Sequence, residues 1–281
     1  MKRFESLIYV LVLLGFVARY ALETDEPPTE PTLPDGKTGT PAFVTPVPKQ
    51  QLDYPDPFDV TVEIEPRRSH GSGTAFLVSD TGRWITARHV VQGCEELYLE
   101  VAPGRALRVD DVVENRRADM AVLTTRALRI APVKYASSMP ERGDAGYMPG
   151  YPQGRAGDIY AQMIGNKRMR TAGQYDVRER VLAWTERQRR PSISGSLGGL
   201  SGGPVFNSQG EVVGIAVAES RRRGRIYSAH PAVFRNGGLV QAGDGTGNAA
   251  AQYPLDPENF DQVGKNLRRK LTVAKAVCIN R

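Results

Sequence analysis

The chain of 281 residues contains little cysteine and little histidine, with two of the first and three of the second. Cys94 and Cys278 have no further metal-ligand residue at the spacing that zinc sites use, so we expect no metal and no cofactor. In an oxidising compartment these two cysteines could form a disulfide, and the alternative is a pair of buried free thiols.

Aromatic residues are also scarce, at 7%. Three basic clusters, at 187–190, 221–223 and 268–270, contribute to a net charge of +6, but no aromatic or groove-reading motif accompanies them. We therefore expect no nucleic-acid partner, since proteins that read nucleic acids combine basic residues with such motifs. Solvated loops, or loose contacts to anionic lipid or envelope polymer, are the simpler interpretation of these clusters.

The apolar run at the N-terminus is too short to cross a membrane. Residues 7–18 are 12 in number and match the core of an export signal, whereas a membrane span needs about 20. Lys2 and Arg3 precede this run, but Phe16 and Arg19 stand where a signal peptidase requires small side chains. We therefore expect residues 1–22 to be a signal peptide or a short membrane anchor of a protein exported to the periplasm or cell envelope.

Residues 23–57 contain too few large apolar residues to form a hydrophobic core. They contain nine prolines among mostly polar residues. Proline at this density keeps a chain extended and solvated, so we predict a linker that holds the following domain away from a membrane or wall.

The rest of the chain is predicted to be an all-β protein. Glycine (29) and proline (20) are frequent, and 40% of the residues are hydrophobic, enough for one large core. Short runs that alternate between apolar and polar residues, with turn residues between most of them, favour a barrel or a sandwich. These runs are 60–64, 74–78, 97–101, 107–109, 120–123, 205–206, 212–218 and 225–228.

Ser201 lies in a segment that suits a nucleophile. Residues 198–204 read GGLSGGP and are followed by the apolar pair Val205 and Phe206. A nucleophilic serine needs a tight bend that presents its hydroxyl, and unobstructed backbone N–H groups beside it. Gly199 permits such a bend, because glycine adopts the positive φ angles that other residues resist.

A histidine and an aspartate upstream have matching contexts. His89 follows an apolar strand that ends near Thr86, and Asp119 precedes the apolar run 120–123. Taken alone, such a histidine is more often structural and such an aspartate is usually a turn residue. The other two histidines lack this setting: His70 precedes the first predicted strand and is read as a solvated loop residue, and His230 has no neighbouring motif of a base.

The order His89, Asp119, Ser201 resembles that of base, orienting acid and nucleophile in the trypsin-like serine proteases. Within that superfamily, residues 71–78 (GSGTAFLV) are similar to the first strand of the HtrA/Deg-type bacterial proteases. Residues 150–154 (GYPQG) are similar to the Gly-x-Pro-x-Gly turn of the same group. The resemblance covers residues 58–235.

This resemblance implies a fold and a set of roles. The fold would be two antiparallel six-stranded β-barrels, about 58–135 and 140–235, with the active site between them. His89, Asp119 and Ser201 would be catalytic, and the backbone N–H groups of Gly199 and Ser201 would form the oxyanion hole. Substrate would contact Gly195 at the base of an uncharged pocket and Tyr227, Ser228 and Ala229 along its wall, which favours a small or medium apolar P1 residue.

The chain also departs from the family pattern. Leu200 stands where an Asn or Asp usually precedes the serine, and leucine cannot pair with a new N-terminal amine, so activation by that route is not expected. The 46 residues from 236 to 281 are too few for the usual PDZ domain of about 90 residues, which we predict to be absent.

We expect these last residues to form an extension with a helix. Asp256 and Pro257 resemble an N-cap and a first helical residue. Phe260, Val263, Leu267, Leu271 and Ala274 recur at helical spacing, with basic residues mostly off that face. The helix is predicted to dock on the second barrel, with partner binding as the alternative.

The function expected from the sequence is an exported serine endopeptidase that acts on proteins or peptides. A catalytically inactive relative that binds peptides, or serves as a scaffold in the cell envelope, is the alternative. The N-terminus gives a means of membrane association, and the sequence does not indicate an oligomeric state.

Overall fold

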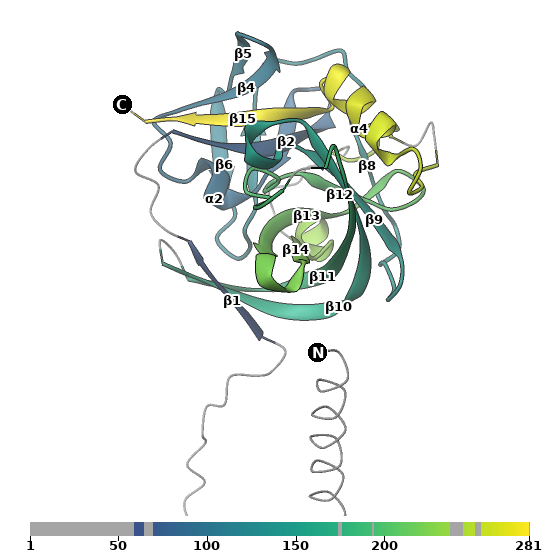
Figure 1. Ribbon diagram of the computed structural model, residues 1–281. Helices are drawn as coiled ribbons and strands as arrows, with labels where there is room; N and C mark the ends of the chain where they lie inside the picture. The colour runs from purple at the N-terminus through teal and green to yellow at the C-terminus, as the bar shows by residue number, and fades with distance from the viewer. Residues whose placement is uncertain are drawn as a thin grey trace, which may run out of the picture. The chain divides into compact units, whose positions relative to one another are not determined.

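The computed structural model describes residues 59–64, 70–173, 176–192, 194–236, 244–250 and 254–280. The predicted signal or anchor (1–22) and the predicted linker (23–57) lie outside the described residues. Within the described ranges, no helix is both long and apolar enough to span a bilayer. Figure 1 shows the described elements, which form two sheets.

The first sheet has seven strands in the order β5-β4-β15-β2-β3-β7-β6. A short helix, α2 (Arg88–Val91), follows β3. Strand β15 comes from the C-terminal end of the chain, yet it lies between β2 and β4 and pairs with both. The strands are β2 (Gly71–Ser79), β3 (Arg83–Thr86), β4 (Glu96–Ala102), β5 (Arg105–Arg108), β6 (Asp111–Glu114), β7 (Ala121–Thr124) and β15 (Val273–Ile279).

The second sheet has eight strands, and six of them close into a ring. Its order is β1-β10-β11-β14-β13-β12-β9, and a further pairing of β9 with β10 completes the ring, while β8 pairs with β13. Strands β1 and β8 are added in parallel. The strands are β1 (Asp59–Ile64), β8 (Lys134–Tyr135), β9 (Ala145–Gly150), β10 (Gly157–Gly173), β11 (Val177–Arg190), β12 (Pro204–Phe206), β13 (Glu211–Ser220) and β14 (Arg225–Ala229).

Short helical turns connect several of these strands. They are η1 (Pro152–Gly154), η2 (Arg221–Arg223) and α3 (Ala232–Asn236). The longest described helix, α4 (Phe260–Arg269), precedes β15.

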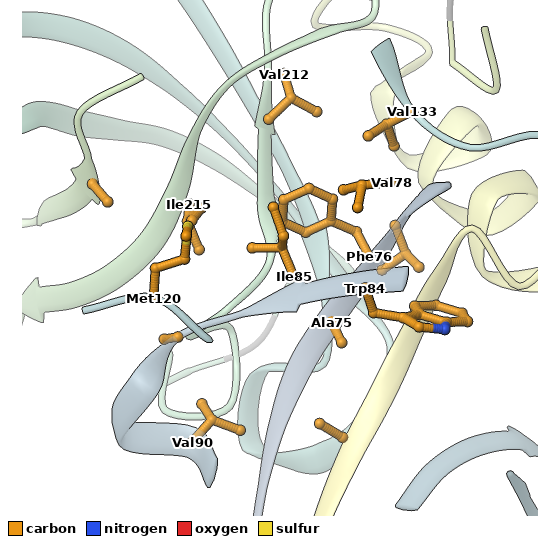
Figure 2. Packing of buried hydrophobic residues seen from close by; sticks show 14 of the residues in the cluster. Ala75, Phe76, Val78, Trp84, Ile85, Val90, Met120, Val133, Val212 and Ile215 are labelled. Atoms are coloured by element: carbon orange, nitrogen blue, oxygen red, sulfur yellow. The ribbon is translucent and has the colours of Figure 1, made fainter. Parts of the chain in front are cut away.

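The prediction of an all-β trypsin-like fold with a C-terminal helix is confirmed, but the strand counts differ from two sets of six. Alternating sequences form the strands because every second side chain points into the core. One hydrophobic cluster contains Phe76 and Ile85 of the first sheet together with Val212 and Ile215 of the second (Figure 2). This shared core holds the two sheets against each other.

The predicted helix is shorter than its apolar pattern indicated. It begins at Phe260 and ends at Arg269, after which Leu271 has a left-handed φ of 58°. Ala274, which was expected on the helix face, lies in β15 and is fully buried. The expected N-cap, Asp256, instead accepts hydrogen bonds from the backbone of the turn before the helix. Residues 273–279 also alternate in burial, and pairing on both edges of β15 favours the strand.

Helix α4 docks on β9 and β10 of the second sheet. The Phe260 ring lies 6.1 Å from that of Tyr147, between ring centroids. Arg268 donates two hydrogen bonds to Asp158 of β10, at 2.7 and 2.6 Å. A Cβ at Gly264 would lie 1.8 Å from Asp158 Oδ1, so only glycine allows this close approach.

A disulfide joins the extension to the first sheet. Cys94, shortly after α2, is bonded to Cys278 of β15, with Cα atoms 5.4 Å apart across 184 positions of sequence. Both strand pairing and a covalent bond therefore tie the C-terminal extension to the region that carries His89.

Candidate active site

Two neighbouring strands of the first sheet bring His89 and Asp119 together. Strands β3 and β7 are antiparallel, with Thr86 opposite Ala121. His89 follows the end of β3, and Asp119 precedes the start of β7. Because antiparallel neighbours place the end of one strand beside the start of the next, these side chains emerge at the same edge of the sheet.

The Asp119 carboxylate holds His89 at two points. Its Oδ2 lies 2.7 Å from Nδ1 of the imidazole, and its Oδ1 accepts the backbone N–H of His89 at 3.0 Å. The side chain of Asp119 is 1% exposed, whereas that of His89 is 17% exposed. A carboxylate on Nδ1 fixes the tautomer that carries its proton there, which leaves Nε2 as the acceptor.

Ser201 lies on a tight turn that is bonded to the first sheet. Its carbonyl oxygen accepts the N–H of Thr74 in β2 at 2.8 Å. The next residue, Gly202, has a φ of 86°, and a Cβ there would lie 2.2 Å from both the Thr74 carbonyl oxygen and Thr86 Oγ1. Glycine at 202 therefore lets the serine turn approach the end of β3, after which His89 follows.

Hydrogen bonds from neighbouring groups hold the carbonyl oxygens of the residues before Ser201. The Gly198 carbonyl accepts the N–H of Gln153 at 2.5 Å, and the Gly199 carbonyl accepts the Thr74 hydroxyl at 2.7 Å. Gly199 has a φ of 97°, and a Cβ on it would lie 2.5 Å from the carbonyl oxygen of Tyr151. Among the residues that the structure describes, neither the Gly199 N–H nor the Ser201 N–H donates to another protein group. Two N–H groups of the serine turn are thus without a protein acceptor in the described part of the chain.

A small pocket opens beside Ser201, with a volume of about 30 Å³. Its walls are mostly apolar and come from the loop before Ser201 and from β13 and β14. They are Leu197, Gly198, Leu200, Ser201, Ala216, Val217, Ala218, Glu219 and Ile226.

The pocket differs from the one expected from sequence. Tyr227, Ser228 and Ala229 are at most 2% exposed and lie within the second sheet, where the Ser228 hydroxyl accepts the indole N–H of Trp184 at 2.9 Å. Gly195 is exposed and is not among the lining residues. The pocket wall nearest the serine comes from β13, as the bond from Gly202 N–H to the Ala216 carbonyl shows, and β14 contributes Ile226. The expected substrate contacts of Gly195, Tyr227, Ser228 and Ala229 stay a prediction.

Comparison with known protein families identifies the family of this chain. The family model of the trypsin-like peptidase domain matches residues 73–215, about half of the chain. The chain belongs to the trypsin-like peptidase family.

Relatives of this trypsin-like peptidase include DegP-like proteins. A probable periplasmic DegP-like serine endoprotease of Hahella chejuensis is 28% identical over 151 residues, covering 53% of this chain and 30% of the relative. The corresponding protein of Rhizobium meliloti is 32% identical over 154 residues, covering 54% and 28%. The putative serine protease HhoA of Synechocystis is 28% identical over 156 residues, covering 54% and 38%. The chain therefore spans about a third of the length of these relatives.

A solved structure shares the fold. The active form of the Rv3671c protease from M. tuberculosis superimposes with a TM-score of 0.51 at 18% identity, covering 65% of this chain and 89% of that one. At this level of identity the likeness concerns the fold alone.

Leu200 departs from the usual residue of the trypsin-like peptidases, and its surroundings explain how it is accommodated. The side chain is 2% exposed and belongs to a buried cluster with Met148 and Val205. Leucine fills this position by apolar packing, so the position contains no group that could bind an amine.

The other two histidines lie away from this peptidase site. His70 is exposed and its Nδ1 accepts the N–H of Asn280 at 3.3 Å. His230 is buried, and its Nδ1 accepts the N–H of Ala232 at 3.1 Å. Over the described ranges, no cluster of three or more His, Cys, Asp or Glu residues could hold a metal ion.

Two acidic residues near the site were not predicted from sequence. Glu219 accepts the Ser196 hydroxyl and, at 2.9 Å, the N–H of Leu197 at the pocket wall. Glu179 of β11 accepts the backbone N–H of Asp119 at 2.9 Å. A signal existed for Glu179, since it occupies an inward position of the alternating run 177–181 (VRERV), whereas Glu219 carried none.

Proposed function

We propose that this chain is an exported serine endopeptidase in which His89, Asp119 and Ser201 act as base, orienting acid and nucleophile. The observation that carries the proposal is the 2.7 Å contact between His89 Nδ1 and Asp119. Two features support it: the serine turn is bonded to the neighbouring strand β2, and two N–H donors of that turn have no acceptor among the described residues.

Each group has a distinct part in the proposed reaction. Neutral His89 removes the hydroxyl proton of Ser201 as that oxygen attacks the peptide carbonyl, and the charged ring then protonates the leaving amine. Asp119 stabilises the charged ring. The N–H groups of Gly199 and Ser201 stabilise the oxyanion, at about 3 kcal/mol per donor in comparable enzymes. Water, deprotonated by His89, then hydrolyses the acyl-enzyme and restores Ser201.

The test of this function is covalent labelling. An organophosphate probe is expected to react with Ser201 in a one-to-one ratio, because the activated hydroxyl attacks phosphorus as it would a carbonyl. Mass spectrometry of the labelled peptide locates the adduct. Ser201→Ala should abolish labelling, and Ser192→Ala, at an exposed serine, should leave it unchanged. A folded protein that binds peptides but takes up no probe would instead be an inactive peptide-binding relative.

The pocket beside Ser201 favours a small aliphatic P1 residue. Its walls include Leu197, Ala216 and Ile226, and the Glu219 carboxylate already accepts two hydrogen bonds from the adjacent loop. Peptides with Ala or Val at P1 should be cleaved at least about tenfold faster, in kcat/KM, than those with Phe or Lys, since even one methylene group in a hydrophobic pocket changes kcat/KM by about 10- to 200-fold. Preferred cleavage after Lys or Arg would contradict this and would make Glu219 the partner of a cationic side chain.

The proposed organisation follows from the sequence and the relatives. Residues 1–22 would export or anchor the chain, 23–57 would be a spacer, 58–235 the protease and 236–281 its extension. Six of the relatives are named periplasmic, which supports a periplasmic or envelope location for this chain. Its partners would be protein or peptide substrates.

A further inference from the structure

Glu179 joins the second sheet to the proposed catalytic aspartate. It lies on β11 between two inward residues, Val177 and Val181, and is 7% exposed. Its Oε1 accepts the backbone N–H of Asp119 at 2.9 Å. Glu179 lies in the second sheet, whose part of the chain also contains Ser201, and Asp119 lies beside the first sheet. The hydrogen bond between Glu179 and Asp119 therefore joins the two halves of the site.

The surroundings of Glu179 disfavour a negative charge. Within the described part of the chain, its Oε2 is buried without a hydrogen-bond partner. Burial, reinforced by the charge of Asp119 and opposed by the bond from the Asp119 N–H, raises the pKa of Glu179 to about 8. On the adjacent strand its partner is Met169, which is apolar. On the other side β11 lies beside β14, and the His230 backbone N–H that follows β14 bonds to the Arg180 carbonyl.

The charge state of Glu179 therefore matters to its neighbours. A neutral carboxyl can accept the Asp119 N–H without adding charge to a water-excluded site. An ionised one would place a second negative charge beside the Asp119 carboxylate, and two such charges repel strongly at low dielectric. That repulsion would act on the carboxylate that holds His89.

We propose that Glu179 is a positioning residue: as a neutral acid it holds the main chain of Asp119, and when it loses its proton its new charge repels the Asp119 carboxylate and disturbs the Asp119–His89 pair. The inference rests on the proposed function for its effect on turnover. Its effects on stability and on the histidine proton are independent of turnover.

The test compares Glu179→Gln with the unmodified protein. Glutamine keeps the shape and the carbonyl acceptor but has no proton to lose near pH 8. In the unmodified protein, kcat on a peptide substrate should fall at least about tenfold between pH 7.5 and 9.5 with little change in KM, because misplacement of a catalytic group lowers kcat. In Glu179→Gln this alkaline decline should be absent. Glu258→Gln, the same change at an exposed position, should retain the decline.

Two further measurements do not need turnover. Between pH 5 and 8 the folded protein holds a proton that an unfolded glutamate has lost, so the melting temperature should decrease with pH, and Glu179→Gln should reduce this slope. The downfield proton resonance of His89 Nδ1–H, identified by its loss in His89→Ala, should shift near pH 8 in the unmodified protein alone.

Several results would overturn the proposal. They are an alkaline decline, a melting slope and a histidine resonance that are the same in Glu179→Gln as in the unmodified protein. Glu179→Met, which removes the acceptor, gives a second test: it should have a lower kcat at every pH, and an unchanged kcat would contradict the positioning role. If the unmodified protein has no turnover, the proposed function fails, and the melting and resonance comparisons still decide the role of Glu179.

Discussion

Replacing His89 with alanine is expected to lower kcat by about 10⁶-fold, as the loss of one member of a catalytic triad does elsewhere. The reason is that no other base is in place: His230 is bonded to the backbone of Ala232, and His70 to that of Asn280. The measurement is steady-state turnover of a peptide substrate, with circular dichroism to establish that the variant is folded.

A double variant makes this prediction sharper. Ser201→Ala and His89→Ala should each lower kcat by about the same factor. The double variant should lower kcat by little more than either single variant, because the two groups act as one unit. Two large losses that add would mean that the residues act independently, contrary to the proposed mechanism. His70→Ala is the matched control and should leave turnover within about twofold, since that ring is exposed and away from the site.

Replacing Ala276 with aspartate is expected to lower the free energy of unfolding strongly at neutral pH, more than any surface substitution in this protein. Ala276 is fully buried in β15, opposite Gly73 of β2 and Leu99 of β4. An unpaired carboxylate at such a position costs about 3–5 kcal/mol, which is a large share of the roughly 5–15 kcal/mol that holds a domain folded. Urea denaturation followed by circular dichroism measures the change in the free energy of unfolding.

The control lies one residue away. Lys275 points to the other face of β15, where its amine pairs with Glu100 at 3.1 Å and its side chain is 23% exposed. Lys275→Gln should change stability by about 1 kcal/mol or less, because partly exposed ion pairs contribute little. Equal stability for Ala276→Asp and Lys275→Gln would show that β15 is not a buried central strand.

In the C-terminal extension, the sequence predicted the helix but not the strand that follows it. Leu271 and Ala274 fit the helical spacing that begins at Phe260, and residues 273–279 also fit a strand. Short apolar runs satisfy both periods, so local pattern could not choose between them. Residues 273–279 form a strand because they lie between β2 and β4, where their backbone N–H and C=O groups are hydrogen-bonded on both sides.

The residues of the site divide in the same way. The sequence determined by itself that Ser201 lies in a glycine-rich bend and that His89 and Asp119 flank strands, because these features depend on local backbone geometry and on period-two alternation. Only the tertiary structure decided that β13 lines the pocket, that Glu179 reaches Asp119 and that β15 enters the first sheet. The physical reason is that a strand's sequence specifies which face is buried but not which distant strand will pair with it. That choice depends on how the whole core packs.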